Sequence, residues 1–121
     1  MASLYTKSFD APDETRTPDK TKLDVVDLGG VRALRMTAQP GWKWSECIKP
    51  VVGGDSCQSH HVGMVASGRM HITHGDGSEM DIGAGDAYVI EPGHDAWVVG
   101  DQPFVGYEFD SSTAASFGKP S

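Results

Sequence analysis

Three residues within a short stretch of the chain, Asp55, Cys57 and His61, carry side chains that bind metal ions. A carboxylate, a thiolate and an imidazole are all ligands for divalent transition metals, and three protein ligands plus a water are typical of catalytic zinc sites. On a strand, residues 55 and 57 would point the same way. Two interpretations follow: a zinc or iron site, or a metal-free cavity wall in which Cys57 is a small buried residue and His61 hydrogen-bonds a neighbour.

Two histidines are candidates for proton transfer. The imidazole of His61 would serve as a general acid or base in a site without metal. His94 follows Pro92-Gly93 in a predicted loop, where its ring could act as a base or, with Asp95, stabilise the turn. His60, adjacent to His61, is expected to face the opposite side of the strand and to be exposed.

Aromatic residues supply candidate walls for a ligand pocket. Trp42, Trp44 and Tyr88 are the residues that we predict to line it, because aromatic side chains around a few polar groups are typical of small-molecule sites. The alternative is ordinary core packing. Trp42 and Trp44 alternate with polar neighbours as on a strand and are expected to share a face. Glu108 is expected to be exposed, as strand charges usually are.

The elements that must position these residues are predicted to be short strands. Fifteen glycines and seven prolines occur at turn signals spaced mostly eight to fourteen residues apart, which is typical of a β-sandwich or small barrel. Asp76-Gly77 is a strong hairpin signal. The apolar runs 87–90 and 97–99 predict strands covered on both faces. No segment has a helical period, so the predicted fold is all-β.

The length of 121 residues fits one domain. We predict a flexible N-terminal arm over residues 1–22, which would add at most one short edge strand. A β-barrel is predicted over residues 23–110. The last segment, residues 111–121, is rich in Ser, Ala and Gly and is predicted to be a flexible tail.

Charge argues against several kinds of partner. The net charge is −7 and the ten basic residues are scattered, which disfavours binding to nucleic acid or to an anionic membrane surface. No apolar run is long enough to span a bilayer, and the N-terminus lacks the apolar core of a signal peptide. We therefore expect a cytoplasmic protein whose Cys47 and Cys57 are thiols, with a single bridge between them as the alternative.

Two stretches resemble the paired motifs of the cupin superfamily. They are GDSCQSHHVGMVASG, at residues 54–68, and GAGDAYVIEPGHDAWVVG, at residues 83–100. The Gly85-Asp86 pair, the strand after it and Gly93 fit the second motif, and the resemblance covers about residues 34–109. It implies a single-domain cupin, that is, a double-stranded β-helix or jelly-roll barrel. It also implies a homodimer, because cupins commonly pair through their sheets.

The metal-ligand positions depart from the pattern of this superfamily. Metal-binding cupins carry a His-x-His pair, a Glu and a further His. Counting along the motifs places Asp55 and Cys57 at the His pair, His61 at the Glu and Ala96 at the last His. The resemblance therefore implies the fold, whereas the three-His, one-Glu site is absent.

Two functions remain open from the sequence. One is an enzyme of the lyase, isomerase or oxygenase type, acting on a small organic molecule inside the barrel with a non-standard metal site or a metal-free acid–base pair. The other is a non-catalytic ligand-binding or sensor protein, which the altered ligand positions favour. We favour the enzyme, because Asp55, Cys57 and His61 are reactive groups rather than apolar ones.

Overall fold

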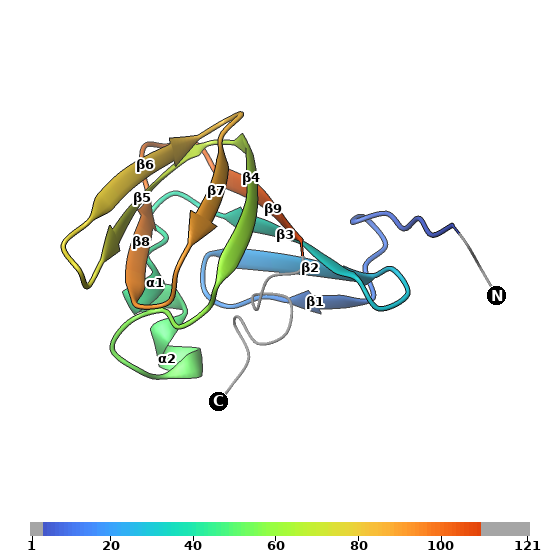
Figure 1. The fold of residues 1–121 in the computed structure, drawn as a ribbon, viewed down its shortest axis with the longest axis horizontal. Helices are drawn as coiled ribbons and strands as arrows, with labels where there is room; N and C mark the ends of the chain where they lie inside the picture. The colour runs from blue at the N-terminus through green and yellow to red at the C-terminus, as the bar shows by residue number, and fades with distance from the viewer. Residues whose placement is uncertain (1–3, 110–121) are drawn as a thin grey trace.

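A computed structural model of the protein describes residues 4–109 (Figure 1). Strands dominate this part of the chain, and two helices of four residues each interrupt them. In chain order the elements are β1 (Glu14–Arg16), β2 (Thr21–Asp27), β3 (Arg32–Ala38), α1 (Trp44–Cys47), α2 (Lys49–Val52), β4 (His61–Ser67), β5 (Arg69–His74), β6 (Glu79–Gly83), β7 (Ala87–Ile90), β8 (His94–Val98) and β9 (Phe104–Phe109).

The strands form two antiparallel sheets that face each other across the core. The larger sheet has the order β1-β2-β3-β9-β4-β7, and the smaller one has the order β6-β5-β8. Figure 1 shows β5, β6 and β8 on one side of the barrel, with α1 and α2 below them and β1–β3 extending away on the opposite side. The chain crosses between the sheets repeatedly, so residues distant in sequence meet inside the barrel.

Alternating burial along the strands decides which side chains enter the barrel. On β8, His94, Ala96 and Val98 are buried, whereas Asp95 and Trp97 are only partly covered. The same alternation holds on β9. Because successive side chains of a strand point to opposite faces, a residue two positions away stays on the same side. This period places selected polar residues among the apolar core.

The predicted all-β fold and the Asp76-Gly77 hairpin are confirmed. Strands β5 and β6 pair in antiparallel fashion, with Thr73 opposite Glu79. Gly77, in the turn between them, has a φ of 92°, a conformation that side chains with a Cβ rarely adopt.

Two local predictions were wrong. Trp44 begins α1 instead of continuing a strand from Trp42, although both tryptophans are buried. Strand β7 is covered on one face only: Tyr88 and Ile90 are buried, whereas Val89 is 56% exposed. The apolar run 87–90 therefore has an apolar outer face as well as an inner one.

The N-terminal segment takes part in the larger sheet. Strand β1 and the first residues of β2 lie within residues 1–22, where a flexible arm with one edge strand was expected. Arg35 on β3 binds Asp24 and also reaches back to Asp10 and the backbone carbonyl of Phe9. The predicted tail, residues 111–121, lies outside the described residues.

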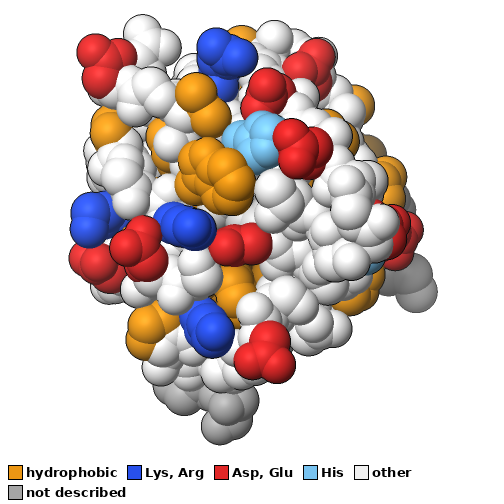
Figure 2. Space-filling view, turned by 90° about the vertical axis from the view of Figure 1, so that its left-hand side faces the viewer, with side chains coloured by type: hydrophobic (Ala, Val, Ile, Leu, Met, Phe, Trp, Pro, Cys, Tyr) orange, Lys and Arg blue, Asp and Glu red, His pale blue; other side chains and the backbone are white. Residues whose placement is uncertain are grey.

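The outer surface beside the smaller sheet carries charges of both signs. Figure 2 shows Lys and Arg side chains on this face interspersed with Asp and Glu, without a cluster of one sign. Within residues 4–109, no helix is long and apolar enough to cross a membrane.

Candidate metal centre

Cys57, His61 and His94 meet inside one end of the barrel. All three are buried, and one potential ligand atom from each lies within 4.8 Å of those from the others. The Cys57 Sγ is 3.7 Å from the Nε2 of His61, and the two imidazole rings meet edge to face with centroids 5.0 Å apart. A thiol and two imidazoles therefore converge on one point, which is the donor chemistry of a transition-metal site.

The backbone holds Cys57 against the start of β8. Cys57 donates its N–H to the carbonyl of His94 at 2.7 Å, and Gly93 donates its N–H to the carbonyl of Cys57 at 2.7 Å. This isolated bridge ties the loop before β4 to the strand that carries His94. Cys57 and His94 are therefore neighbours in space although 37 positions separate them.

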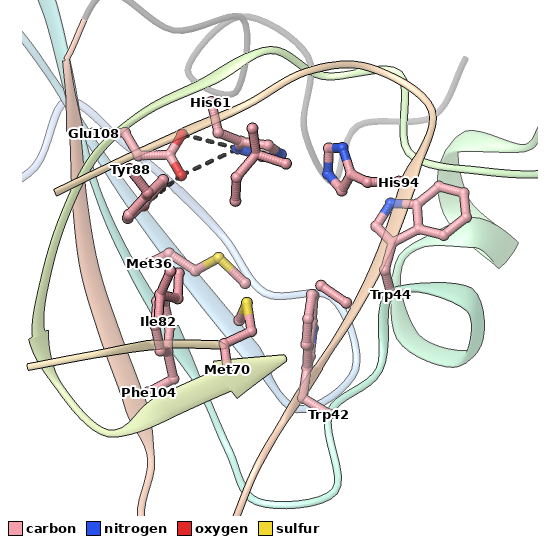
Figure 3. A pocket seen from close by; sticks show the side chains of 12 residues that line it. Met36, Trp42, Trp44, His61, Met70, Ile82, Tyr88, His94, Phe104 and Glu108 are labelled. Atoms are coloured by element: carbon pink, nitrogen blue, oxygen red, sulfur yellow. Dashed lines mark hydrogen bonds and ion pairs between the residues drawn. The ribbon is translucent and has the colours of Figure 1, made fainter. Parts of the chain in front are cut away.

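A carboxylate orients His61. Glu108, on β9, is 3% exposed, and its two oxygens lie 3.0 and 3.1 Å from the Nδ1 of His61. A carboxylate oxygen accepts, so Nδ1–H is the donor. Tyr88, on β7, donates its O–H to the same carboxylate at 2.8 Å. Figure 3 shows Glu108 holding one nitrogen of the His61 ring. The other nitrogen, Nε2, is thereby directed toward Cys57.

A backbone carbonyl orients His94 in the same way. The Nδ1 of His94 lies 2.7 Å from the carbonyl oxygen of Glu91, which can only accept. The proton is therefore on Nδ1, and Nε2 is the nitrogen available to a metal. Histidine ligands in metalloproteins almost always donate their second ring N–H to a carboxylate or a carbonyl, and both histidines here do so.

Electrostatic coupling favours an ionised thiol. Burial by itself raises the pKa of Cys57, but its interactions with His61 and His94 outweigh burial and lower the pKa to about 6. Burial lowers the pKa of His61, but the charge of Glu108 and the interaction with Cys57 raise it to about 10. Burial and the negative charge of Glu108 both raise the pKa of Tyr88, so its hydroxyl stays a donor. These opposite pKa shifts favour a thiolate–imidazolium pair in the metal-free site near neutral pH, and thiolate is the form that binds metals.

The histidines open onto a small cavity in the centre of the barrel. Its volume is about 20 Å³, which is room for about one or two waters. Figure 3 shows Glu108 and Tyr88 on one side of His61, with His94 and Trp44 on the other, and the sulfur atoms of Met36 and Met70 between the walls. The lining residues are Met36, Trp42, Trp44, His61, Met70, Ile82, Tyr88, Ile90, His94, Ala96, Phe104 and Glu108.

The predicted residues have different places in this arrangement. Asp55 lies in the loop before Cys57 rather than on a strand, and its side chain is exposed, so it does not join the ligand group. His94, which was expected in a loop, begins β8 and takes the third position. Trp42, Trp44 and Tyr88 all line the cavity.

Of two predictions for the surroundings of the cluster, one is confirmed and one is wrong. His60 faces outward, as expected, with 43% of its side chain exposed and Glu91 3.6 Å away. Glu108 was expected to be exposed and is instead buried against His61. One sequence signal could have predicted the burial of Glu108: it lies two positions after Gly106 and therefore on the same inward face of β9.

Neither cysteine is in a disulfide. Cys47 and Cys57 are both free and buried, as expected for thiols. Cys47 lies on α1, and its sulfur is 3.9 Å from the Oδ2 of Asp19. Only one of the two cysteines therefore belongs to the candidate metal centre.

Comparison with solved structures shows which known fold this architecture has. A Klebsiella pneumoniae protein with a double-stranded β-helix domain superposes with a TM-score of 0.58 and 21% identity, over 86% of this chain and 81% of that one. The chain has the cupin fold. No protein-family model matches this sequence, and no curated protein matches it significantly.

Two further solved structures are similar over part of their length. Oxalate decarboxylase from Bacillus subtilis has a TM-score of 0.56 and 18% identity, over 88% of this chain and 28% of that one. AerE from Microcystis aeruginosa has a TM-score of 0.55 and 17% identity, over 78% of this chain and 46% of that one. At these identities the likeness establishes the fold alone, and the chain spans about a quarter of the decarboxylase.

The structure also accounts for the altered metal-ligand pattern. Ala96 stands where the resemblance places the last His, and it lines the cavity. His94 is two residues earlier on β8, so it projects from the same face of the strand. An imidazole is therefore present on the strand where a metal-binding cupin would carry one, displaced by one repeat of the pleat.

Proposed function

We propose that this cupin binds one divalent transition-metal ion through the Sγ of Cys57 and the Nε2 atoms of His61 and His94. We further propose that it is an enzyme acting on a small organic molecule at that centre. One observation carries the proposal. Each imidazole holds its Nδ1–H in a hydrogen bond to a fixed acceptor, which leaves Nε2 for a metal, and potential ligand atoms of both rings and of Cys57 lie within 4.8 Å of one another. Sets of three protein ligands are typical of catalytic rather than structural zinc sites.

The donor set favours zinc or iron. Solved structures of oxalate decarboxylase are described with Mn(II) centres. Manganese prefers oxygen ligands, whereas a thiolate with two imidazoles suits zinc or iron. Because Cys57 supplies sulfur and Asp55 is exposed, no carboxylate belongs to the proposed ligand set. We therefore propose zinc or iron in preference to manganese.

Each residue of the centre has a distinct task. When bound, a zinc or iron ion of this kind polarises an oxygen atom of a substrate or activates water. Glu108 keeps the proton of His61 on Nδ1, and Tyr88 holds Glu108 in place. The apolar walls exclude bulk water, which strengthens the electrostatic interactions inside the cavity. With metal bound, His61 and His94 act as ligands. Without metal, either ring would instead transfer a proton.

The altered metal-ligand positions favour a second candidate function. Ala96, which lines the cavity, offers no ligand atom where the resemblance places the last His. The cavity, with a volume of about 20 Å³, admits only a very small ligand unless the side chains move, and a non-catalytic sensor of such a ligand would fit the same space. Binding of a ligand that is recovered unchanged after long incubation would favour the sensor over the enzyme.

The test is the metal content of the purified protein, measured by elemental mass spectrometry. We expect close to one zinc or iron per chain in the wild type and a loss of at least tenfold in Cys57→Ala and His94→Ala. Cys47→Ala is the matched control, because it removes the other buried cysteine and should keep the metal. A wild type that stays metal-free after incubation with zinc, or variants that keep their metal, would disprove the metal centre.

A further inference from the structure

Two buried donors beside the cavity have no hydrogen-bond acceptor within residues 4–109. Trp42 and Trp44 are each 2% exposed, and neither indole N–H finds an acceptor in the described part of the chain. Both residues line the cavity, and in Figure 3 the indole nitrogen of Trp44 faces its interior. Buried donors in native proteins are nearly always satisfied, so an unpaired pair beside one cavity requires an explanation.

Core packing alone does not explain these tryptophans. An indole N–H donates and cannot accept, so only an acceptor atom can satisfy it. A phenylalanine at either position would fill the wall with no unpaired polar group. The cost of burying two N–H groups is recovered only when an acceptor enters the cavity, so a ligand that displaces water from it must supply an acceptor in its place.

The charges around the cavity restrict what that acceptor is. The lining already contains the Glu108 carboxylate, and none of the described residues that line it is Lys or Arg. The cation of the metal-free site, the imidazolium of His61, is already paired with Glu108 and lies against the Cys57 sulfur. An anionic ligand would thus be buried near two negative groups without an unpaired cation, which is unfavourable. An uncharged molecule with an oxygen acceptor avoids this penalty.

The rest of the lining is apolar and partly adaptable. Met36 and Met70 place their sulfur atoms in the middle of the cavity (Figure 3). Methionine is unbranched and changes conformation readily, so these two side chains can yield room for a ligand of a few non-hydrogen atoms. Ile82 and Phe104 would then contact its apolar part.

We propose that the cavity binds a small, uncharged carbonyl or amide compound, whose oxygen accepts hydrogen bonds from the indole N–H groups of Trp42 and Trp44. This proposal names a class of ligand for the proposed site. Any reaction of that ligand rests on the proposed function, whereas its binding does not. The cavity discriminates against the carboxylate anion of the same shape. Acetamide and acetate provide that comparison, because they have nearly the same shape and differ in charge.

The experiment follows the indole N–H resonances of the 15N-labelled full chain loaded with zinc. The sequence contains three tryptophans, so three signals are expected, which Trp→Phe variants assign. Acetamide should shift the signal of Trp42, Trp44 or both downfield in a saturable manner, with a Kd on the order of millimolar for so small a ligand. Trp97, on β8 and packed against His71 outside the cavity, is the internal control and should not move.

The substituted proteins and the anion complete the test. Trp44→Phe keeps the ring and removes the donor, so we expect acetamide affinity to fall by about three- to tenfold. Trp97→Phe should leave affinity unchanged. In the metal-free protein, where no Zn²⁺ can bind a carboxylate, acetate should bind at least tenfold more weakly than acetamide. Equal or tighter binding of acetate to the metal-free protein, absence of saturable shifts at Trp42 and Trp44, or an equal response of Trp97 would overturn the proposal.

Repeating the titration on metal-free protein separates this proposal from the metal centre. If the protein binds no metal but the indole signals still respond to acetamide, the metal centre fails and the ligand class stands. If zinc binds in stoichiometric amount and the signals do not respond, the ligand class fails and the metal centre stands.

Discussion

At the scale of single residues, Glu108 determines how the candidate centre works. Its carboxylate accepts from the Nδ1–H of His61 and from the hydroxyl of Tyr88, while 3% of the residue is exposed. A buried carboxylate with two donors is well satisfied, and it fixes the tautomer of the imidazole that it holds. Partners of this kind commonly contribute ten- to a hundredfold to metal affinity.

Glu108→Gln should therefore weaken zinc binding without removing a ligand. The amide keeps the shape of the side chain but loses the charge that favours Nδ1–H on His61. We expect affinity to fall by about 10- to 100-fold, measured by competition with a chromophoric chelator. Glu79→Gln, which changes an exposed carboxylate on the outer face of β6, should leave affinity unchanged. An unchanged affinity in Glu108→Gln would mean that Glu108 has only a packing role.

The ionisation of Cys57 makes a second prediction at this scale. Since its pKa lies near 6 instead of the ordinary 9.0, the metal-free protein should contain a thiolate at pH 7 that is lost as pH falls through about 6. The difference in ultraviolet thiolate absorbance between wild type and Cys57→Ser measures it. A depressed pKa stabilises the folded state above the unfolded pKa, and that contribution disappears as pH falls through the folded value. Thiolate absorbance that rises only above pH 9 would contradict the prediction.

The sequence identified three residues of the site, wrongly included a fourth and missed Glu108. Cys57 and His61 were identified by their chemistry, and His94 as a candidate base. Asp55 was included because a strand was assumed where the chain forms a loop. Glu108 was excluded because buried strand carboxylates are rare without partners, and its partners lie 20 and 47 positions away. Sequence spacing carries no information about such distant contacts.

At the scale of the elements, the approach of β4 to β9 brings His61 and Glu108 together. Gly63 on β4 lies opposite Glu108 on β9. A Cβ at position 63 would collide with the carbonyl oxygen of Tyr107 and lie 2.9 Å from the Cγ of Glu108. The absence of a side chain at Gly63 therefore permits the strand spacing on which the His61–Glu108 hydrogen bond depends.

Gly63→Ala should destabilise the protein and loosen the centre. Overpacking of this kind costs about 1–3 kcal/mol, measured as the free energy of unfolding in urea. Zinc affinity should fall as well, because β9 moves away with Glu108. Gly83→Ala is the control: an added Cβ at position 83 meets nothing closer than 3.6 Å, so its stability should stay within about 0.5 kcal/mol of wild type. Equal stability of the two variants would contradict this account of the strand contact.

Element prediction succeeded where periodicity was long enough to read. The alternation on β3 and β5 and the turn at Gly77 come from local preferences that the chain itself specifies. The two helices contain four residues each, which is too short for a 3.6-residue period to appear. Strand β7 is apolar on both faces, and periodicity cannot tell a covered face from an apolar exposed one.

At the scale of the whole molecule, the fold leaves an apolar row on the outside of β4 and β7. Val62 and Val89 lie opposite each other in the register and are 37% and 56% exposed, and Met64 beside them is 44% exposed. Exposed apolar groups that adjoin one another on a sheet are typical of interaction surfaces. We propose that this row contributes to the homodimer that the cupin resemblance implies.

The dimer proposal predicts the mass of the protein in solution. Size-exclusion chromatography with light scattering should give twice the mass of one chain at micromolar concentration. Val62→Lys combined with Val89→Lys should shift the protein to monomer, because burying two charged side chains in such a contact is unfavourable. Val31→Lys, which changes an equally exposed valine in the β2–β3 turn, should remain dimeric. A monomeric wild type would contradict the proposal.

The most direct test of the account is the absorption spectrum of the protein after loading with Co²⁺. If Cys57 is a ligand, the spectrum should show a thiolate-to-cobalt charge-transfer band in the near ultraviolet at one equivalent of metal. Cys57→Ser should lose this band, whereas Cys47→Ser should keep it. Cobalt bound without the band, or a band that survives in Cys57→Ser, would show that the metal does not lie at Cys57, His61 and His94.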